Sequence, residues 1–316
     1  LSKNSRLPFT DIAKLIGSNH PTVWYRVVRL NEMGVIQKFT TCIYRLAVGV
    51  KRQKEVLFKI SNLTKEQRET LIKTFCAHPR VVRVIELQGS WNFSLTLCGE
   101  TIIDIKNILN SLRKHLQDYN HEYTVLPTYH DETIRTSFFL EGEEFNIDLS
   151  SITSAYQSEI VRSPALIPKY VEDLDDKDLL ILQKLRDDSR ITLKDLAKAT
   201  SLDPKAVDAR IKRFCKIYLL RGFLLHLNYE VLGYTCFWLR LQINVDEKRN
   251  RELNEYIRTI PEAYEYFEYL DMWNVNIRFL TKNQEQIEHV FNEILEKFKD
   301  IIRNHEILIQ KKEHKL

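Results

Sequence analysis

The most informative stretch of the sequence is residues 185–214, which read LRDDSRITLKDLAKATSLDPKAVDARIKRF. Residues 1–30 read LSKNSRLPFTDIAKLIGSNHPTVWYRVVRL and align with that stretch without gaps, at a constant offset of 184. The identical residues are Leu1, Ser5, Arg6, Asp11, Ala13, Lys14, Val23, Arg26 and Arg29, each with its counterpart 184 positions later. Self-similarity at a fixed offset is typical of duplicated structural units, so the sequence predicts one module used twice.

The later copy has the full pattern of three helices. Leu179, Leu182 and Leu185 lie at helical spacing and predict the apolar face of a first helix, after an acidic start that suits the positive end of the helix dipole. Thr192 is the expected N-cap of a short second helix. The third helix is expected over about 204–217, because Asp203 can cap it and a proline occupies its first position.

The third helix and the segment after it complete a winged helix-turn-helix. Val207, Ile211 and Phe214 are expected to face the core, and Leu219 begins a wing, which we expect to be a hairpin. Folds of this kind place their last helix in the major groove of DNA. The sequence therefore predicts a nucleic-acid-binding module.

The first copy repeats the same pattern without its first helix. Its recognition helix is expected over 20–33, with Val23, Val27 and Leu30 facing inward and Gly34 ending it. Val35–Thr40 is the expected wing. Residues aligned with 175–184 are missing, and we expect further sequence before Leu1.

A second module follows each helix-turn-helix. HPRVVRVIELQGSWNFSLTL at 78–97 aligns with IPEAYEYFEYLDMWNVNIRF at 260–279, at an offset of 182. In the first copy the expected elements, in order, are a strand at Glu55–Ser61, a helix at Thr64–Ala77, strands at Val81–Gln88 and Phe93–Cys98, a helix at Thr101–Leu116 and a strand at Glu122–Thr128. This βαββαβ order is ferredoxin-like, with two helices on one face of the sheet. The other face lacks cover in its own module, so we expect it to pair with the second copy.

The chain is thus predicted to be α+β, with two winged helix-turn-helix domains and two ferredoxin-like domains. The expected boundaries are 1–45, 46–130, a linker at 131–174, 175–230 and 231–316. The linker is expected to contain a short strand at Ser137–Leu140.

The distribution of charge favours DNA as the partner of the first module. The net charge is only +4, but residues 1–45 contain seven Lys or Arg residues against two acidic residues. Arginine and lysine on a recognition helix bind phosphates or guanine edges. A solvated basic face is the plainer interpretation of one basic helix, but turn, caps, wing and local charge together favour DNA. The candidate contact residues are His20, Thr22, Trp24, Tyr25, Arg26, Arg29, Lys38, Lys205, Arg210, Lys212 and Arg213.

The second recognition helix is the weaker candidate. Asp203 and Asp208 lie on it and oppose phosphate, so we expect it to bind DNA weakly or to serve mainly as structure.

Composition argues against several other classes of protein. Five widely spaced cysteines form no C-x-x-C pair, which indicates reduced thiols and neither a zinc site nor a disulfide framework. No apolar run is long enough to cross a bilayer, and the start has no signal-peptide pattern. We expect a cytoplasmic protein without metal, cofactor or catalytic residues.

These motifs resemble the Lrp/AsnC family, in particular archaeal forms in which two units are fused in one chain. The resemblance implies a DNA-binding transcription regulator whose second modules are RAM domains. It also implies that the two RAM domains pair within the chain as a pseudo-dimer, with further homo-oligomers open.

Family members often bind an amino acid near a Gly-x-x-Asp turn, and this implies a candidate effector site here. The turn reads Gly89, Ser90, Trp91, Asn92 in the first copy and ends in Trp273 and Asn274 in the second. Since the acid is replaced by an amide, which cannot form an ion pair with an amino group, amino-acid binding is not favoured. A different effector, or none, remains open, and the plainer role of both tryptophans is packing.

Two alternatives remain. Siroheme decarboxylases share this architecture, but they need clustered His and Arg, and His78, His115, His121 and His130 are scattered. A non-specific architectural DNA binder is the other alternative.

Overall fold

The structure is a computed structural model that describes residues 4–44, 52–133 and 174–315. The chain divides into two compact units. The helix-turn-helix unit comprises Leu1–Val48 with Phe139–Leu232, and the sheet unit comprises Gly49–Phe138 with Gly233–Leu316. The expected strand at Ser137–Leu140, and all of the expected linker beyond residue 133 except its last residue, lie outside the described residues.

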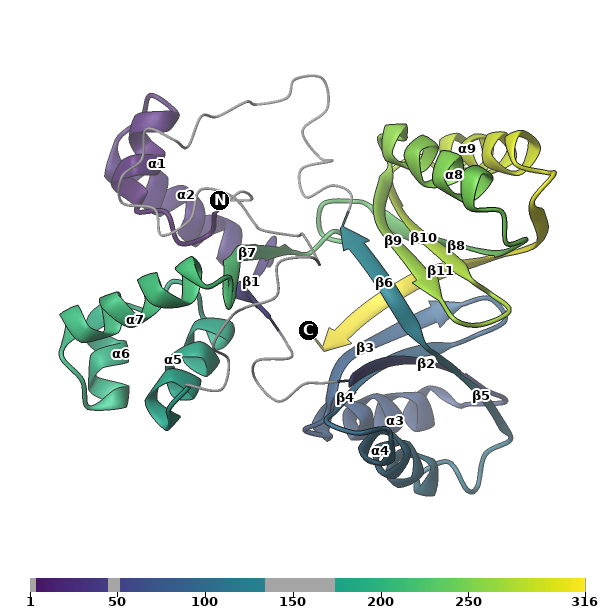
Figure 1. The fold of residues 1–316 in the computed structure, drawn as a ribbon, viewed down its shortest axis with the longest axis horizontal. Coiled ribbons are helices and arrows are strands. Elements are labelled where there is room, and N and C mark those ends of the chain that lie inside the picture. Colours follow the sequence, from purple (N-terminus) through teal and green to yellow (C-terminus); the bar gives the residue numbers. More distant parts are fainter. Residues whose placement is uncertain (1–3, 45–51, 134–173, 316) are drawn as a thin grey trace. The chain divides into compact units, whose positions relative to one another are not determined.

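The helix-turn-helix unit contains both copies of the first module (Figure 1). Its elements are α1 (Phe9–Leu15), α2 (His20–Glu32), β1 (Ile36–Ile43), α5 (Asp176–Asp187), α6 (Leu193–Thr200), α7 (Pro204–Lys216) and β7 (Leu220–Leu227). The expected caps are present: Thr192 accepts from the Asp195 N–H, and Asp203 accepts from the Lys205 N–H. Such caps satisfy amide groups that have no partner inside a helix.

The expected wings form one shared ribbon. β1 and β7 pair antiparallel with each other in a two-stranded sheet, so each wing strand finds its partner in the other copy (Figure 1). The expectation of a separate hairpin in each copy was wrong. Strands of high β-propensity need a partner, but their sequence does not say whether that partner is local.

Two expected core residues are exposed. Leu30 is 38% exposed, whereas its counterpart Phe214 is fully buried in a cluster with α5. No described helix precedes α1 in the first copy, so nothing among the described residues covers Leu30 in that way. Leu179 is 42% exposed because the buried stripe of α5 consists of Ile181, Leu182 and Leu185, on another side of the helix.

The sheet unit contains the βαββαβ order twice. The first set is β2 (Arg52–Ile60), α3 (Lys65–Ala77), β3 (Val81–Gln88), β4 (Phe93–Gly99), α4 (Ile102–Lys114) and β5 (His121–Leu126). The second is β8 (Thr235–Ile243), α8 (Glu247–Thr259), β9 (Ala263–Tyr269), β10 (Val275–Thr281), α9 (Gln284–Lys297) and β11 (Ile302–Lys315). Each helix pair packs on its own half of the sheet and buries a separate apolar core.

The two halves form one nine-stranded sheet, in the order β5-β2-β4-β3-β11-β8-β10-β9-β6. β11 pairs with β8 and then continues along β3, and β6 (Thr128–Thr133) pairs with β9. Only Pro127 separates β5 from β6, so the two ends of this order are one continuous segment and the pairing closes on itself. The expected pairing of the two modules within one chain is therefore what the sheet shows.

β6 was not expected, and the expected linker start at residue 131 falls inside it. Its sequence, TYHDET, has no alternation of apolar and polar residues. Its partner lies in the other half of the sheet unit, more than a hundred residues away, so no local pattern indicates it.

Candidate nucleic-acid interface

Helix α2 presents aromatic and cationic side chains to solvent. Asn19 caps it by accepting from the Thr22 N–H at 2.9 Å, and Val23 and Val27 anchor its inner face. The helical period then turns Trp24 and Tyr25 outward, where they are 52% and 58% exposed.

The arginines of α2 share that outer side. Arg26 and Arg29 are exposed and take part in none of the ion pairs among the described residues. His20 is exposed with its ring centroid 6.1 Å from that of Phe9, and Lys38 on β1 is half-buried. Among the described residues, Arg26 and Arg29 therefore give α2 positive charge outside ion pairs, beside the flat rings of Trp24 and Tyr25, which suits phosphates and base edges.

The cations of α7 are largely paired within the protein. Arg210 Nη1 lies 2.7 Å from an Asp175 carboxylate oxygen and 2.6 Å from one of Asp178. Arg213 Nη2 lies 2.5 Å from Asp178, and Lys212 Nζ lies 2.7 Å from Asp208. Among the α7 candidates only Lys205 is exposed without such a pair among the described residues.

These ion pairs change the titration of their members. The hydrogen bond to Asp175 raises the pKa of Arg210, aided by Asp178, and the hydrogen bond from Arg210 holds the pKa of Asp175 below its ordinary value. The acidic start of α5 suggested a favourable helix dipole in sequence, but Asp178 is 1% exposed and is a partner of the recognition helix. The sequence alone could not show that Asp178 lies within ion-pair distance of the arginines on α7.

The asparagines of the two sheet-unit turns bind backbone. Asn92 accepts from the Ile60 N–H at 2.8 Å and donates to the Ile60 carbonyl at 2.9 Å. Asn274 makes the same two bonds to Ile243, both at 2.8 Å. Each amide therefore fastens its turn to the end of a neighbouring strand, a structural role that the sequence did not reveal.

The other residues of those turns also make structural contacts. A Cβ on Gly89, which has a φ of +136°, would lie 2.7 Å from Leu308 Cδ2, so this glycine permits a close approach of β11. Trp91 and Trp273 are half-buried, and the Arg240 guanidinium lies 5.2 Å from the Trp273 ring centroid. Effector binding at these turns remains a prediction.

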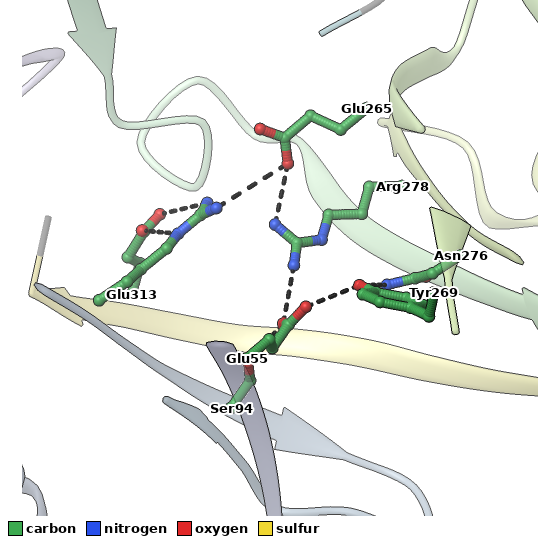
Figure 2. Close-up of polar contacts among 8 residues, drawn as sticks. Glu55, Ser94, Glu265, Tyr269, Asn276, Arg278 and Glu313 are labelled. Carbon is green, nitrogen blue, oxygen red and sulfur yellow. Dashed lines mark hydrogen bonds and ion pairs between the residues drawn. The ribbon is translucent and has the colours of Figure 1, made fainter. Parts of the chain in front are cut away.

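A buried polar network links the two halves of the sheet unit, and sequence reasoning missed it (Figure 2). Arg278 lies 3.0 Å from Glu55 and 2.9 Å from Glu265, and Glu55 also accepts from Ser94 and Tyr269. Arg83 extends the chain of contacts to Glu265 and to Glu313. The network thus joins β2, β3 and β4 of the first half to β9, β10 and β11 of the second.

The network holds its central carboxylate in the charged form. Burial acts to raise the pKa of Glu55, but the charge of Arg278 and the hydrogen bonds from Ser94 and Tyr269 outweigh it and hold that pKa below 4.5. Burial, together with the charge of Glu55, raises the pKa of Tyr269 well above 10. The tyrosine therefore stays a hydrogen-bond donor at neutral pH.

No group of three or more His, Cys, Asp or Glu side chains able to hold a metal ion occurs among the described residues. None of the helices within the described ranges has the length and apolar character needed to span a bilayer.

Both helix-turn-helix segments match known domain families. Residues 174–214 match the AsnC-type helix-turn-helix domain, and residues 1–37 match a winged helix-turn-helix DNA-binding domain.

Two relatives are transcription regulators. The chain is 28% identical over 116 residues to the regulator FL11 of Pyrococcus furiosus. This alignment covers 37% of this chain and 76% of FL11. The chain is 39% identical over 74 residues to the regulator LrpA of Pyrococcus abyssi. This alignment covers 21% of this chain and about half (52%) of LrpA.

Among solved structures, the siroheme decarboxylase NirDL is similar with a TM-score of 0.62 and 14% identity, over 98% of this chain and 87% of that one. At this identity the likeness concerns the fold alone. DNA-binding transcription regulation is the function that the domain matches and relatives support. The chain therefore carries an AsnC-type helix-turn-helix domain and a second winged helix-turn-helix DNA-binding domain, and its relatives include helix-turn-helix transcription regulators.

Proposed function

We propose that this chain is an Lrp/AsnC-type transcription regulator in which two winged helix-turn-helix domains and two RAM domains form an internal pseudo-dimer. Helix α2 is the main recognition helix and lies in the major groove of double-stranded DNA. The protein is not an enzyme in this proposal, and a small-molecule effector is an open part of it.

The observation that carries the proposal is the contrast between the two recognition helices. Arg26 and Arg29 on α2 are exposed and outside the ion pairs of the described residues, whereas their counterparts Arg210 and Arg213 bind aspartates at the N-terminal end of α5. A guanidinium without a protein partner is available to phosphate, and each such contact releases counterions from DNA.

The test is a salt titration of DNA affinity by gel shift. We expect Arg26→Ala with Arg29→Ala to weaken binding and to lower the slope of log affinity against log salt by about 1–2, since each phosphate contact contributes about 0.9. Arg251→Ala, on the exposed side of α8, is the matched control and should leave both quantities unchanged. Unchanged affinity of the double variant would contradict the proposal.

The alternatives predict different results. An architectural binder would bind random DNA as tightly as selected DNA at the same salt concentration. An enzyme of the NirDL kind would show a tetrapyrrole-dependent rise in melting temperature, because ligands that bind only the folded state stabilise it. We expect neither.

A further inference from the structure

We propose that the DNA target consists of two unequal half-sites at a fixed spacing, one for α2 and one for α7. This inference rests on the proposed function and deepens it. It depends on two observations: the frame that holds the two recognition helices is symmetric, and the surfaces that they expose are not.

The frame has the reciprocal contacts of a two-fold arrangement. Ser5 Oγ lies 2.7 Å from Ser189 Oγ, its own counterpart at the offset of 184. Arg6 Nη1 donates to the Ser189 carbonyl, and Arg190 Nη1 donates to the Ser5 carbonyl at 2.6 Å. When residue i contacts j and the counterpart of i contacts the counterpart of j, the two copies are related by a two-fold axis.

The β1–β7 ribbon obeys the same symmetry. Thr40 pairs with Leu224, which is its own counterpart, so the axis crosses the ribbon there. On either side, the Tyr44 N–H donates to the Leu219 carbonyl and the Asn228 N–H donates to the Val35 carbonyl, both at 2.8 Å. The ribbon and the serine contact therefore fasten the two helix-turn-helix copies to each other within one compact unit.

The inner faces of the two recognition helices match. Val23 and Val27 of α2 correspond to Val207 and Ile211 of α7, and all four are buried. Both helices also have an Asn or Asp N-cap and a proline in the first turn. The two helices therefore sit in equivalent places in their own modules.

The outer faces do not match. Trp24 and Tyr25 of α2 correspond to Asp208 and Ala209 of α7. Val28 corresponds to Lys212, whose side chain is 67% exposed and is paired with Asp208. One helix thus offers aromatic surface with arginines that have no ion-pair partner in the described part of the chain, and the other offers an acidic residue, a small residue and a paired lysine.

These surfaces suit different base pairs. An aromatic side chain makes apolar contact with the methyl group of thymine, whereas a carboxylate accepts a hydrogen bond from the amino group of cytosine. Two-fold related helices contact half-sites about one helical turn, or a multiple of it, apart, in inverted orientation. The geometry fixes spacing and orientation, and the side chains make the two half-sites differ in sequence.

The first experiment selects duplexes from a randomised pool with the full chain. We expect enrichment of two different half-sites in inverted orientation, with a spacing that tolerates no insertion. A perfect palindrome, or a single half-site, would overturn the inference but not the proposed function. Failure to enrich any sequence, with tight binding to random DNA, would overturn both.

The second experiment transfers one surface to the other helix. The variant Trp24→Asp, Tyr25→Ala, Val28→Lys gives α2 the outer residues of α7 and should gain about tenfold or more in affinity for a palindrome of the α7 half-site. The reverse variant, Asp208→Trp, Ala209→Tyr, Lys212→Val, should gain similarly for a palindrome of the α2 half-site.

Both variants change residues outside the buried core, and circular dichroism melting checks that they fold. Arg251→Ala again serves as the control and should keep the preference of the unmodified chain. If both variants fold and neither changes the preferred half-site, the outer residues do not set specificity and the inference fails.

Discussion

At the scale of the residue, Gly89 shows how packing against a neighbouring strand can require a glycine in a turn. Its φ of +136° is open only to glycine at low cost, and a Cβ there would also lie 3.2 Å from the Ile307 carbonyl oxygen. The close approach of β11 therefore accounts for a glycine at this position of the turn.

We expect Gly89→Ala to destabilise the sheet unit by about 2–3 kcal/mol, because backbone strain adds to overpacking against Leu308. Urea unfolding measures the effect. The control is Gly233→Ala, which has a positive φ of +80° but nothing within 4 Å of the new Cβ, and should cost about 1 kcal/mol. Equal losses in the two variants would show that the contact with Leu308 is unimportant.

Glu55 is the residue whose replacement tests the buried network. It accepts hydrogen bonds from Ser94 and Tyr269 and pairs with Arg278, and its side chain is 8% exposed. Removing one partner leaves the other charge buried without compensation, so Glu55→Gln is expected to cost about 3 kcal/mol. Thermal unfolding checks this value, and exposed Glu285→Gln should change little.

At the scale of the element, the buried network makes the stability of the strand pairing between the two halves depend on pH. The pKa of Glu55 is lower in the folded state than its ordinary value of 4.5. A carboxylate shifted in this direction stabilises the fold above pH 4.5, and that stabilisation is lost as the pH falls from there through the folded pKa.

The expected outcome is a steep loss of stability below pH 4.5, seen in urea midpoints measured from pH 7 to pH 3. In Glu55→Gln this part of the pH dependence should be absent, while Glu285→Gln should retain it. If Glu55→Gln lost stability below pH 4.5 as steeply as the unmodified chain, groups other than Glu55 would be responsible for the acid sensitivity.

The elements also show which parts of the fold a sequence can reveal. Helices with local signals were predicted well: Thr192 caps α6 and Asp203 caps α7, as expected. The two βαββαβ orders follow from periodicity within short segments. The β1–β7 ribbon and β6 were missed because their partners are distant in sequence.

The candidate interface was predicted in the same uneven way. The outward turn of Trp24, Tyr25, Arg26 and Arg29 follows from helical period alone, and it is observed. Arg210 pairs with Asp175 and Asp178, which are more than thirty positions away in the sequence. The sequence alone therefore could not show which arginines of the recognition helices are paired within the protein. The buried network was missed because a charged residue on an antiparallel strand is ordinarily expected on the solvent-exposed face.

At the scale of the whole molecule, the closed pairing of the sheet unit bears on oligomeric state. β11 and the β5–β6 segment each pair with strands of both halves, so the two halves are joined at two places within one chain. Unpaired strand edges are a common route to association. Pairing of β3 with β11 and of β9 with β6 occupies edges that two separate chains would otherwise share.

We expect a mass near 37.6 kDa, that of one chain, by light scattering coupled to size exclusion. Dilution should not lower the melting temperature, since an internal pair has no concentration dependence. A stable dimer across dilution would mean that the internal pairing is supplemented by a second interface.

The last strand of the sheet has a consequence for biosynthesis. Residues near the carboxyl end, such as Glu313, pair with β3 residues such as Ile85, more than two hundred positions earlier. Contacts of such separation form slowly, and domains otherwise tend to fold as they leave the ribosome. We therefore expect the first half of the sheet to lack its β11 partner until β11 has been synthesised, an interval in which the β3 edge is open to association.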